Sequence, residues 1–191
     1  MKYVVSALAD GRASGPETAA GRGGALLQDF YGTVTQAAFT FNGLWWILAG
    51  LKFDEWMRDR LQRRRVYDIT LYFLLPGMIS LISLLAVEER LIWRFGFGIG
   101  ATLGALEAVY SLRSARRFGE RSLVFLGADA LSIVVYAGNA AVAIKPSLLE
   151  TVGIGLKPLE VEGILIAILL GLGLFLAAVM FIRSAALTQE A

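Results

Sequence analysis

Long hydrophobic stretches alternate along this chain with short charged or turn-forming segments. A helix of about 20 apolar residues, rising roughly 1.5 Å per residue, spans the ~30 Å hydrocarbon layer of a membrane. The pattern therefore predicts an all-α, polytopic integral membrane protein, built as a bundle of five transmembrane helices. The predicted spans are residues 31–51, 69–87, 91–112, 122–144 and 163–182.

The five predicted spans and their loops use nearly everything after Asp29 and leave little room for a second domain. We expect a five-helix transmembrane domain over residues 30–184 and a short C-terminal tail over residues 185–191. Residues 1–29 are rich in glycine and alanine around Pro16. This composition predicts an N-terminal tail that is flexible or becomes ordered on a partner.

The segment 52–66, between the first two spans, is basic and amphipathic. Its apolar side chains fall on one helical face, while acids and arginines occupy most of the rest. We interpret it as the cytoplasmic end of the first helix or as a short helix at the membrane surface, with Arg63, Arg64 and Arg65 near lipid headgroup phosphates. Alternatively, these arginines only fix the topology. The apolar residues are Phe53, Trp56, Met57 and Leu61.

Lysine and arginine are unevenly distributed between the loops on the two sides of the predicted bundle. Ten of them lie between the first and second spans or between the third and fourth, against four in the opposing loops or, for Arg94, about one turn inside the adjoining span. Short loops rich in Lys and Arg mark the cytoplasmic side. We therefore expect the N-terminus outside and the C-terminus inside.

Composition narrows the classes of chemistry that are open to this chain. Hydrophobic residues make up 57% and charged residues 18%, and the chain has no histidine and no cysteine. Disulfides, thiolate nucleophiles and the commonest zinc ligands are thereby excluded. We find no glycine-rich nucleotide loop and no nucleophile elbow, so we expect no enzyme, cofactor or metal. The sequence pI near 9.0 reflects basic residues at span ends rather than a nucleic-acid surface.

Polar residues follow one face of the first predicted span. Asp29, Thr33, Gln36 and Thr40 recur at intervals of four, three and four residues, and Asn42 lies beside them. A polar face toward lipid would leave its amides without hydrogen-bond partners. The face should therefore line a pore or pack within the bundle or across a subunit interface.

Two acidic residues fall well inside predicted spans. Glu107 and Asp129 lie at similar depth on the hairpin made by the third and fourth spans. An ionisable group in the membrane usually has a partner or a function. Three interpretations stay open: Glu107 pairs with the arginines of the following loop, Asp129 is neutral and hydrogen-bonded, or both acids face an aqueous cavity that binds a cation or a proton.

Small residues recur every four positions in the third span. Gly96, Gly100, Gly104 and Ala108 form a ridge on which another helix can approach closely. The ridge predicts helix packing, within one chain or between subunits.

An odd number of spans does not divide into two inverted halves, and one small bundle has little interior volume. Our leading hypothesis is therefore a homo-oligomeric, cation-permeable channel or pore in a bacterial inner (plasma) membrane. The polar face of the first helix or the acidic hairpin would line it. One alternative is a non-catalytic subunit or sensor that binds a partner protein; a weaker one is a proton-coupled transporter that uses the buried carboxylates. Lipids and further copies of the chain are the expected partners.

Overall fold

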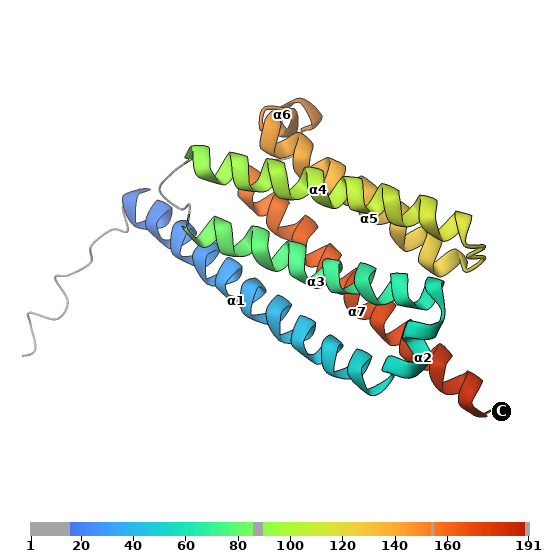
Figure 1. The fold of residues 1–191 in the computed structure, drawn as a ribbon. Helices are drawn as coiled ribbons and strands as arrows, with labels where there is room; N and C mark the ends of the chain where they lie inside the picture. The colour runs from blue at the N-terminus through green and yellow to red at the C-terminus, as the bar shows by residue number, and fades with distance from the viewer. Residues whose placement is uncertain (1–15, 86–89, 154, 190–191) are drawn as a thin grey trace, which may run out of the picture.

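A computed structural model describes residues 16–85, 90–153 and 155–189, and every regular element among them is a helix. Five of these helices are long, and two are short and lie at opposite ends of the bundle (Figure 1). The helices are α1 (Pro16–Leu51), α2 (Phe53–Arg58), α3 (Arg60–Leu85), α4 (Arg90–Arg117), α5 (Leu123–Ile144), α6 (Leu148–Val152) and α7 (Pro158–Gln189).

Four helices in the described part of the chain are long and apolar enough to cross a membrane. The prediction of an all-α protein with membrane-spanning helices is therefore confirmed at this level. The first predicted span, residues 31–51, lies in α1 and is not among the four, because polar side chains lower its mean hydropathy. The four segments are Arg60–Leu84, Arg94–Arg117, Leu123–Ile144 and Pro158–Ala185.

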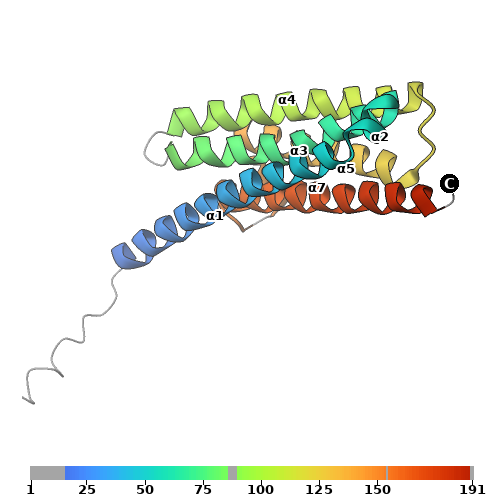
Figure 2. The same cartoon turned by 60° about the horizontal axis from the view of Figure 1, so that its bottom comes forward.

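Helix α3 occupies the middle of the bundle and contacts α1, α4 and α7. Figure 1 shows α3 between α1 and α4, and Figure 2 shows α7 running along the bundle beneath them. Helices α4 and α5 pack against each other as an antiparallel hairpin. We call the end that carries α2, the α4–α5 turn and the C-terminal part of α7 the basic end, because most of the arginines lie there.

Several helices extend further than the hydrophobic pattern predicts. Helix α1 begins at Pro16, inside the segment 1–29 that we expected to be a tail, and α7 continues through Gln189. Helix α3 begins at Arg60 rather than near residue 69. Once a helix is nucleated, each added residue gains a backbone hydrogen bond, so a helix can continue into polar flanking sequence. Residues 1–15 and 190–191 lie outside the described residues.

The junction between α2 and α3 divides the amphipathic segment 52–66. Asp59 has extended backbone angles, φ −86° and ψ 129°, which end α2. Its carboxylate then accepts hydrogen bonds from the backbone N–H groups of Leu61 and Gln62, both at 3.3 Å. A carboxylate in this position caps the first turn of the next helix.

Helix α2 is anchored to the bundle by a tryptophan. Trp56 is fully buried and stacks on Trp45 of α1, with ring centroids 5.4 Å apart. The indole of Trp45 also donates a hydrogen bond to the carbonyl oxygen of Val66 at 3.1 Å. On the polar side of α2, hydrogen bonds from Ser184 and Lys52 lower the pKa of Glu55. Helix α2 is thus held to α1 by Trp45 and to α7 by Ser184, and it also packs against α3.

The small-residue ridge of α4 faces other helices of the same chain. A Cβ atom at Gly96 or Gly100 would meet isoleucine side chains of α3, and one at Gly104 would meet the ring of Tyr136 on α5. Ala108 is buried as well. In the single chain, the ridge therefore lets α3 and α5 approach α4 closely.

Candidate functional site

The polar row of α1 points away from the bundle. Asp29, Thr33, Gln36 and Thr40 are all exposed. Successive residues of an α-helix are rotated by about 100° around its axis. On this basis the polar side chains of the row point, on average, to the side of α1 opposite its buried face. By the same rule, Asn42 lies at the edge of the buried face rather than beside the polar row. It is half-buried, and its Oδ1 has no hydrogen-bond partner. The buried side chains of α1 are those of Tyr31, Val34, Thr35, Ala38, Trp45 and Ala49.

A buried ionic network joins α3, α4 and α5 near the basic end. Arg65 of α3 is 3% exposed, and Asp129 of α5 is 0% exposed. The Nη1 group of Arg65 donates to both carboxylate oxygens of Asp129, at 3.2 Å and 3.0 Å. The same nitrogen lies 3.5 Å from Oδ2 of Asp68, one turn further along α3. One arginine thus holds two carboxylates from different helices.

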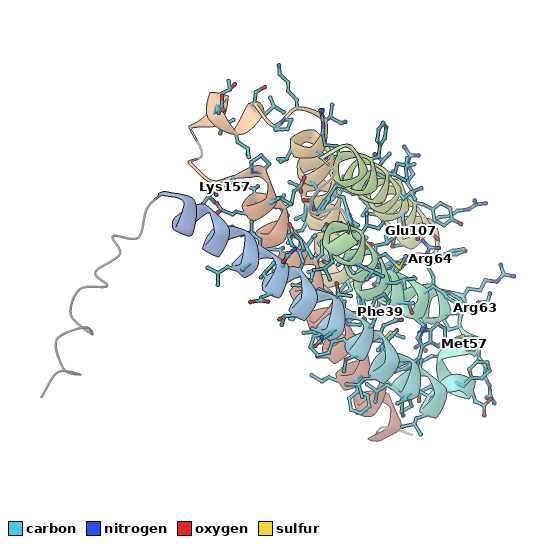
Figure 3. All side chains as sticks on the ribbon, turned by 90° about the vertical axis from the view of Figure 1, so that its left-hand side faces the viewer. Phe39, Met57, Arg63, Arg64, Glu107 and Lys157 are labelled. Atoms are coloured by element: carbon cyan, nitrogen blue, oxygen red, sulfur yellow. The ribbon has the colours of Figure 1, made fainter. Side chains whose placement is uncertain are left out.

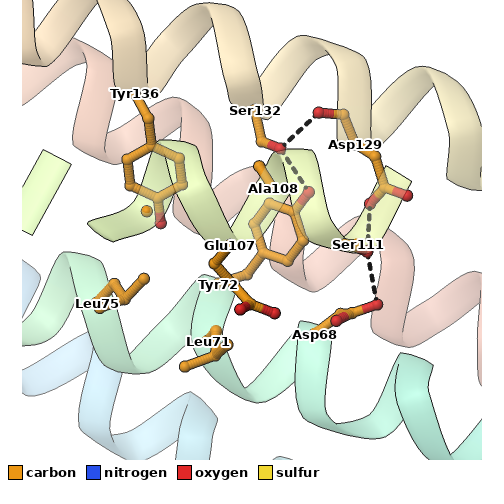
Figure 4. A pocket seen from close by; sticks show the side chains of 11 residues that line it. Asp68, Leu71, Tyr72, Leu75, Glu107, Ala108, Ser111, Asp129, Ser132 and Tyr136 are labelled. Carbon is orange, nitrogen blue, oxygen red and sulfur yellow. Dashed lines mark hydrogen bonds between the residues drawn. The ribbon is translucent and has the colours of Figure 1, made fainter. Parts of the chain in front are cut away.

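Ser111 of α4 connects the two carboxylates. Its hydroxyl oxygen lies 2.8 Å from Oδ2 of Asp68 and 3.3 Å from Oδ1 of Asp129 (Figure 4). A hydroxyl has one proton to donate, so it can serve one of these oxygens at a time. The three side chains are all buried, and their arrangement fixes the register of three helices.

Arg64 extends the network toward the outer face of α4. Its guanidinium pairs with Glu107, its Nε lies 2.8 Å from Oδ1 of Asp68, and it stacks 4.5 Å from the ring centroid of Tyr110. The side chains of Arg64 and Glu107 are 21% and 31% exposed, so this pair is more accessible than the pair of Arg65 and Asp129. Figure 3 shows Arg64 directed toward Glu107, whereas Arg63 extends outward from the bundle.

A small cavity lies between α3, α4 and α5 beside the network. The carboxylates of Asp68, Glu107 and Asp129 line it together with the hydroxyl groups of Tyr72 and Ser132, which are hydrogen-bonded at 2.9 Å (Figure 4). The space open to the centre of a water molecule is about 20 Å³. This volume accommodates a single water molecule.

The carboxylates that line the cavity outnumber the guanidinium groups paired with them. Asp68, Glu107 and Asp129 contact only Arg64 and Arg65 in this network, which leaves one negative charge in excess when all five groups are ionised. Glu107 is the most accessible of the three carboxylates, with 31% of its side chain exposed, so water can solvate part of this charge, whereas Asp68 and Asp129 depend on their arginine partners. Among the residues that the structure describes, acidic side chains form no group arranged to hold a metal ion.

The structure brings together Glu107 and Asp129 but separates both from the polar row of α1. Their partners are arginines of α3, not those of the loop that follows α4. Arg64 and Arg65 do not extend outward from the bundle, because α3 begins at Arg60 and both side chains turn into the network, where Arg65 is buried and Arg64 half-buried. That these arginines lie near lipid phosphates stays a prediction. Of the three arginines assigned to lipid headgroups, Arg63 alone is fully exposed.

Sequence reasoning missed Asp68 and Ser111, which lie at the centre of the network. The spacing of Arg65, Asp68 and Tyr72, at i, i+3 and i+7, places these polar side chains on one face of α3. That signal was available in the sequence. It was masked because the hydrophobic run that defined the second span begins only at residue 69.

No family model, curated protein or solved structure matches this chain.

Proposed function

We propose that several copies of this chain assemble into a cation-permeable membrane pore lined by the polar face of α1. In this proposal α1 crosses the membrane in addition to the four candidate spans, which makes five spans in all. The N-terminus then lies outside and the C-terminus inside. One observation carries the proposal: Asp29, Thr33, Gln36 and Thr40 are exposed on the side of α1 that faces away from its own bundle.

Two features support a membrane position for α1. It packs along α3, which contains one of the four candidate membrane spans, and its 36 residues exceed the length that a crossing requires. If its polar face met lipid, the amide of Gln36 would lose hydrogen bonds to water without replacement. Other copies of the chain, gathered around a water-filled axis, would give these groups polar surroundings.

The chemistry of the row suits permeation by cations. The carboxylate of Asp29 would attract cations at the outer mouth. Further in, the oxygens of Thr33, Gln36 and Thr40 carry no formal charge, so they would bind a cation too weakly to trap it. A pore lined by the acidic hairpin has less support, because Glu107 and Asp129 are already paired with arginines.

Cysteine cross-linking in membranes tests the assembly. The chain has no native cysteine, so single-cysteine variants give unambiguous products. We expect Gln36→Cys to form cross-linked dimers with a short bifunctional thiol reagent. The matched control is Val134→Cys, a residue of α5 that is 67% exposed on another face, and it should not cross-link. Equal cross-linking of both variants, or of neither, contradicts the proposal. Cross-linking of Gln36→Cys to a different protein favours the partner-binding subunit instead.

A second candidate, proton-coupled transport, is favoured by the cavity between α3, α4 and α5. Three carboxylates share two guanidinium groups there, so the network has one position at which a proton can be taken up and released. Asp129→Asn removes that imbalance. If this candidate is right, proton flux through liposomes that contain the purified chain is lost in Asp129→Asn and unchanged in Gln36→Leu. The pore proposal predicts that Gln36→Leu is the variant that alters flux.

A further inference from the structure

A second cavity opens at the basic end of the bundle, separate from the cavity beside Asp129. The space open to the centre of a water molecule is about 210 Å³, which exceeds that of the first cavity roughly tenfold. Its apolar walls include Trp56, Phe125 and Met180. Its polar lining includes Gln62, Arg65 and Arg183 together with the carboxylates of Asp59 and Glu120.

Arg65 lines this second cavity and also contacts two carboxylates that line the first one. Its Nη1 is occupied by Asp129 and Asp68. Its Nε and Nη2 are buried and have no hydrogen-bond partner. Glu120 forms a longer ion pair with this second edge: its Oε2 is 3.7 Å from Nε, within ion-pairing range but beyond hydrogen-bonding distance. Buried guanidinium N–H groups without an acceptor are unfavourable, and the Nε–Nη2 edge matches two oxygens of one oxyanion.

A second guanidinium lies against the same aromatic ring. Arg65 and Arg183 are 4.6 Å and 5.1 Å from the ring centroid of Phe125. Arg183 uses its Nη2 to donate to Ser122 at 2.6 Å, and it remains exposed. Gln62 lines the same space, and its buried Oε1 has no hydrogen-bond partner.

We propose that this cavity binds a phosphate-type oxyanion between Arg65 and Arg183. The Nε–Nη2 edge of Arg65 takes two of its oxygens, while Nη1 keeps its contact with Asp129. Arg183 supplies the second positive charge. Asp59 does not compete for the arginines, because its carboxylate caps the start of α3. Phosphate has enough acceptor oxygens for both guanidinium groups, and the apolar walls can hold the carbon attached to its ester.

Two sources can supply this group: the headgroup of an anionic phospholipid, or a soluble phosphate. Basic residues beside a membrane span lie at the depth of lipid phosphates, and the cavity lies at the basic end. The experiment therefore has two arms. In the first, thermal unfolding of the purified full-length chain in detergent is followed by tryptophan fluorescence against inorganic phosphate, with chloride at matched ionic strength as the reference. In the second, unfolding is compared in nanodiscs of phosphatidylglycerol and of phosphatidylcholine.

We expect a saturable rise in the unfolding temperature with phosphate, with phosphatidylglycerol, or with both; the arm that responds identifies the source. Arg183→Gln and Gln62→Glu should each weaken the apparent affinity about tenfold, since one removes a charge-assisted contact and the other adds a repelling carboxylate. The control is Arg113→Gln, an exposed residue of α4 outside the cavity, which should leave the affinity within about twofold. A non-saturable effect in both arms would overturn the proposal, because the cavity then binds no oxyanion and holds only water. Equal weakening by Arg113→Gln would also overturn it, because the stabilisation then comes from general surface charge.

Discussion

Arg65 of α3 and Asp129 of α5 form an ion pair inside the bundle, with Nη1 3.0 Å from Oδ2. The two residues are 64 positions apart in the sequence, and both are buried. The pair therefore joins α3 to α5 directly. Several tests of the fold follow from this relationship and from the contacts around it.

Removing one partner of this pair should destabilise the protein strongly. Asp129→Leu leaves the Arg65 guanidinium buried without its main counter-charge, and loss of one partner from a buried pair typically costs about 3–5 kcal/mol. The free energy of unfolding can be measured by titration with sodium dodecyl sulfate in mixed micelles. The double variant Arg65→Met with Asp129→Leu should recover most of the loss, because the guanidinium that Asp129→Leu leaves without its main counter-charge is then removed as well. A double variant as unstable as the single one would contradict this account.

The pair of Arg64 and Glu107 should contribute less. Both side chains are partly exposed, so water compensates for a lost partner. We expect Glu107→Gln to change the free energy of unfolding by about 0–1 kcal/mol. A loss as large as that of Asp129→Leu would mean that Glu107 is much less accessible to water than its exposure indicates.

The glycine ridge of α4 provides a test of helix approach with a control in the same helix. A Cβ atom at Gly104 would come within 3 Å of three ring atoms of Tyr136. Gly104→Ala should therefore destabilise the protein by about 1–3 kcal/mol, through forced movement of that ring. A Cβ atom at Gly98 meets nothing within 4 Å, so Gly98→Ala should be neutral or stabilising by up to about 1 kcal/mol. The same effect at both positions would contradict the packing of α4 against α5.

Trp56 tests whether α2 belongs to the packed structure. Its indole is fully buried, so Trp56→Ala should lower the free energy of unfolding by about 3–5 kcal/mol. Phe53, in the same short helix, is 56% exposed, and Phe53→Ala should have an effect below about 1 kcal/mol. If α2 only rests on the lipid surface, the two variants will instead have similar, small effects.

The sequence predicted the long helices well and the ionic network poorly, for a physical reason. Span length and hydrophobicity are local properties, so the helices around Leu91, Leu123 and Gly163 could be located from the sequence. The contact between Arg65 and Asp129 depends on how α3 and α5 rotate and slide against each other. That geometry is set by many small packing contacts, which one sequence does not reveal.

The amphipathic pattern of residues 52–66 was also ambiguous. Phe53 and Trp56 lie on the same face of α2 by their spacing, yet Trp56 is fully buried and Phe53 is 56% exposed. The difference arises because Trp45 of α1 stacks on Trp56, a contact that the pattern of residues 52–66 does not contain. The exposed polar face of α1 was one of several outcomes that the sequence left open. The direction of this face follows from the burial of Tyr31 and Ala38 on the opposite side of the helix, which depends on contacts with other helices.

The central claim is that the polar face of α1 meets a water-filled path shared by several copies. The most direct measurement is cation flux through liposomes that contain Gln36→Cys, before and after treatment with a charged methanethiosulfonate reagent, with Val134→Cys as the control. We predict cation flux in both untreated variants and a block by the reagent in Gln36→Cys alone. Flux that is absent from the start, or equally insensitive to the reagent in both variants, would contradict the claim.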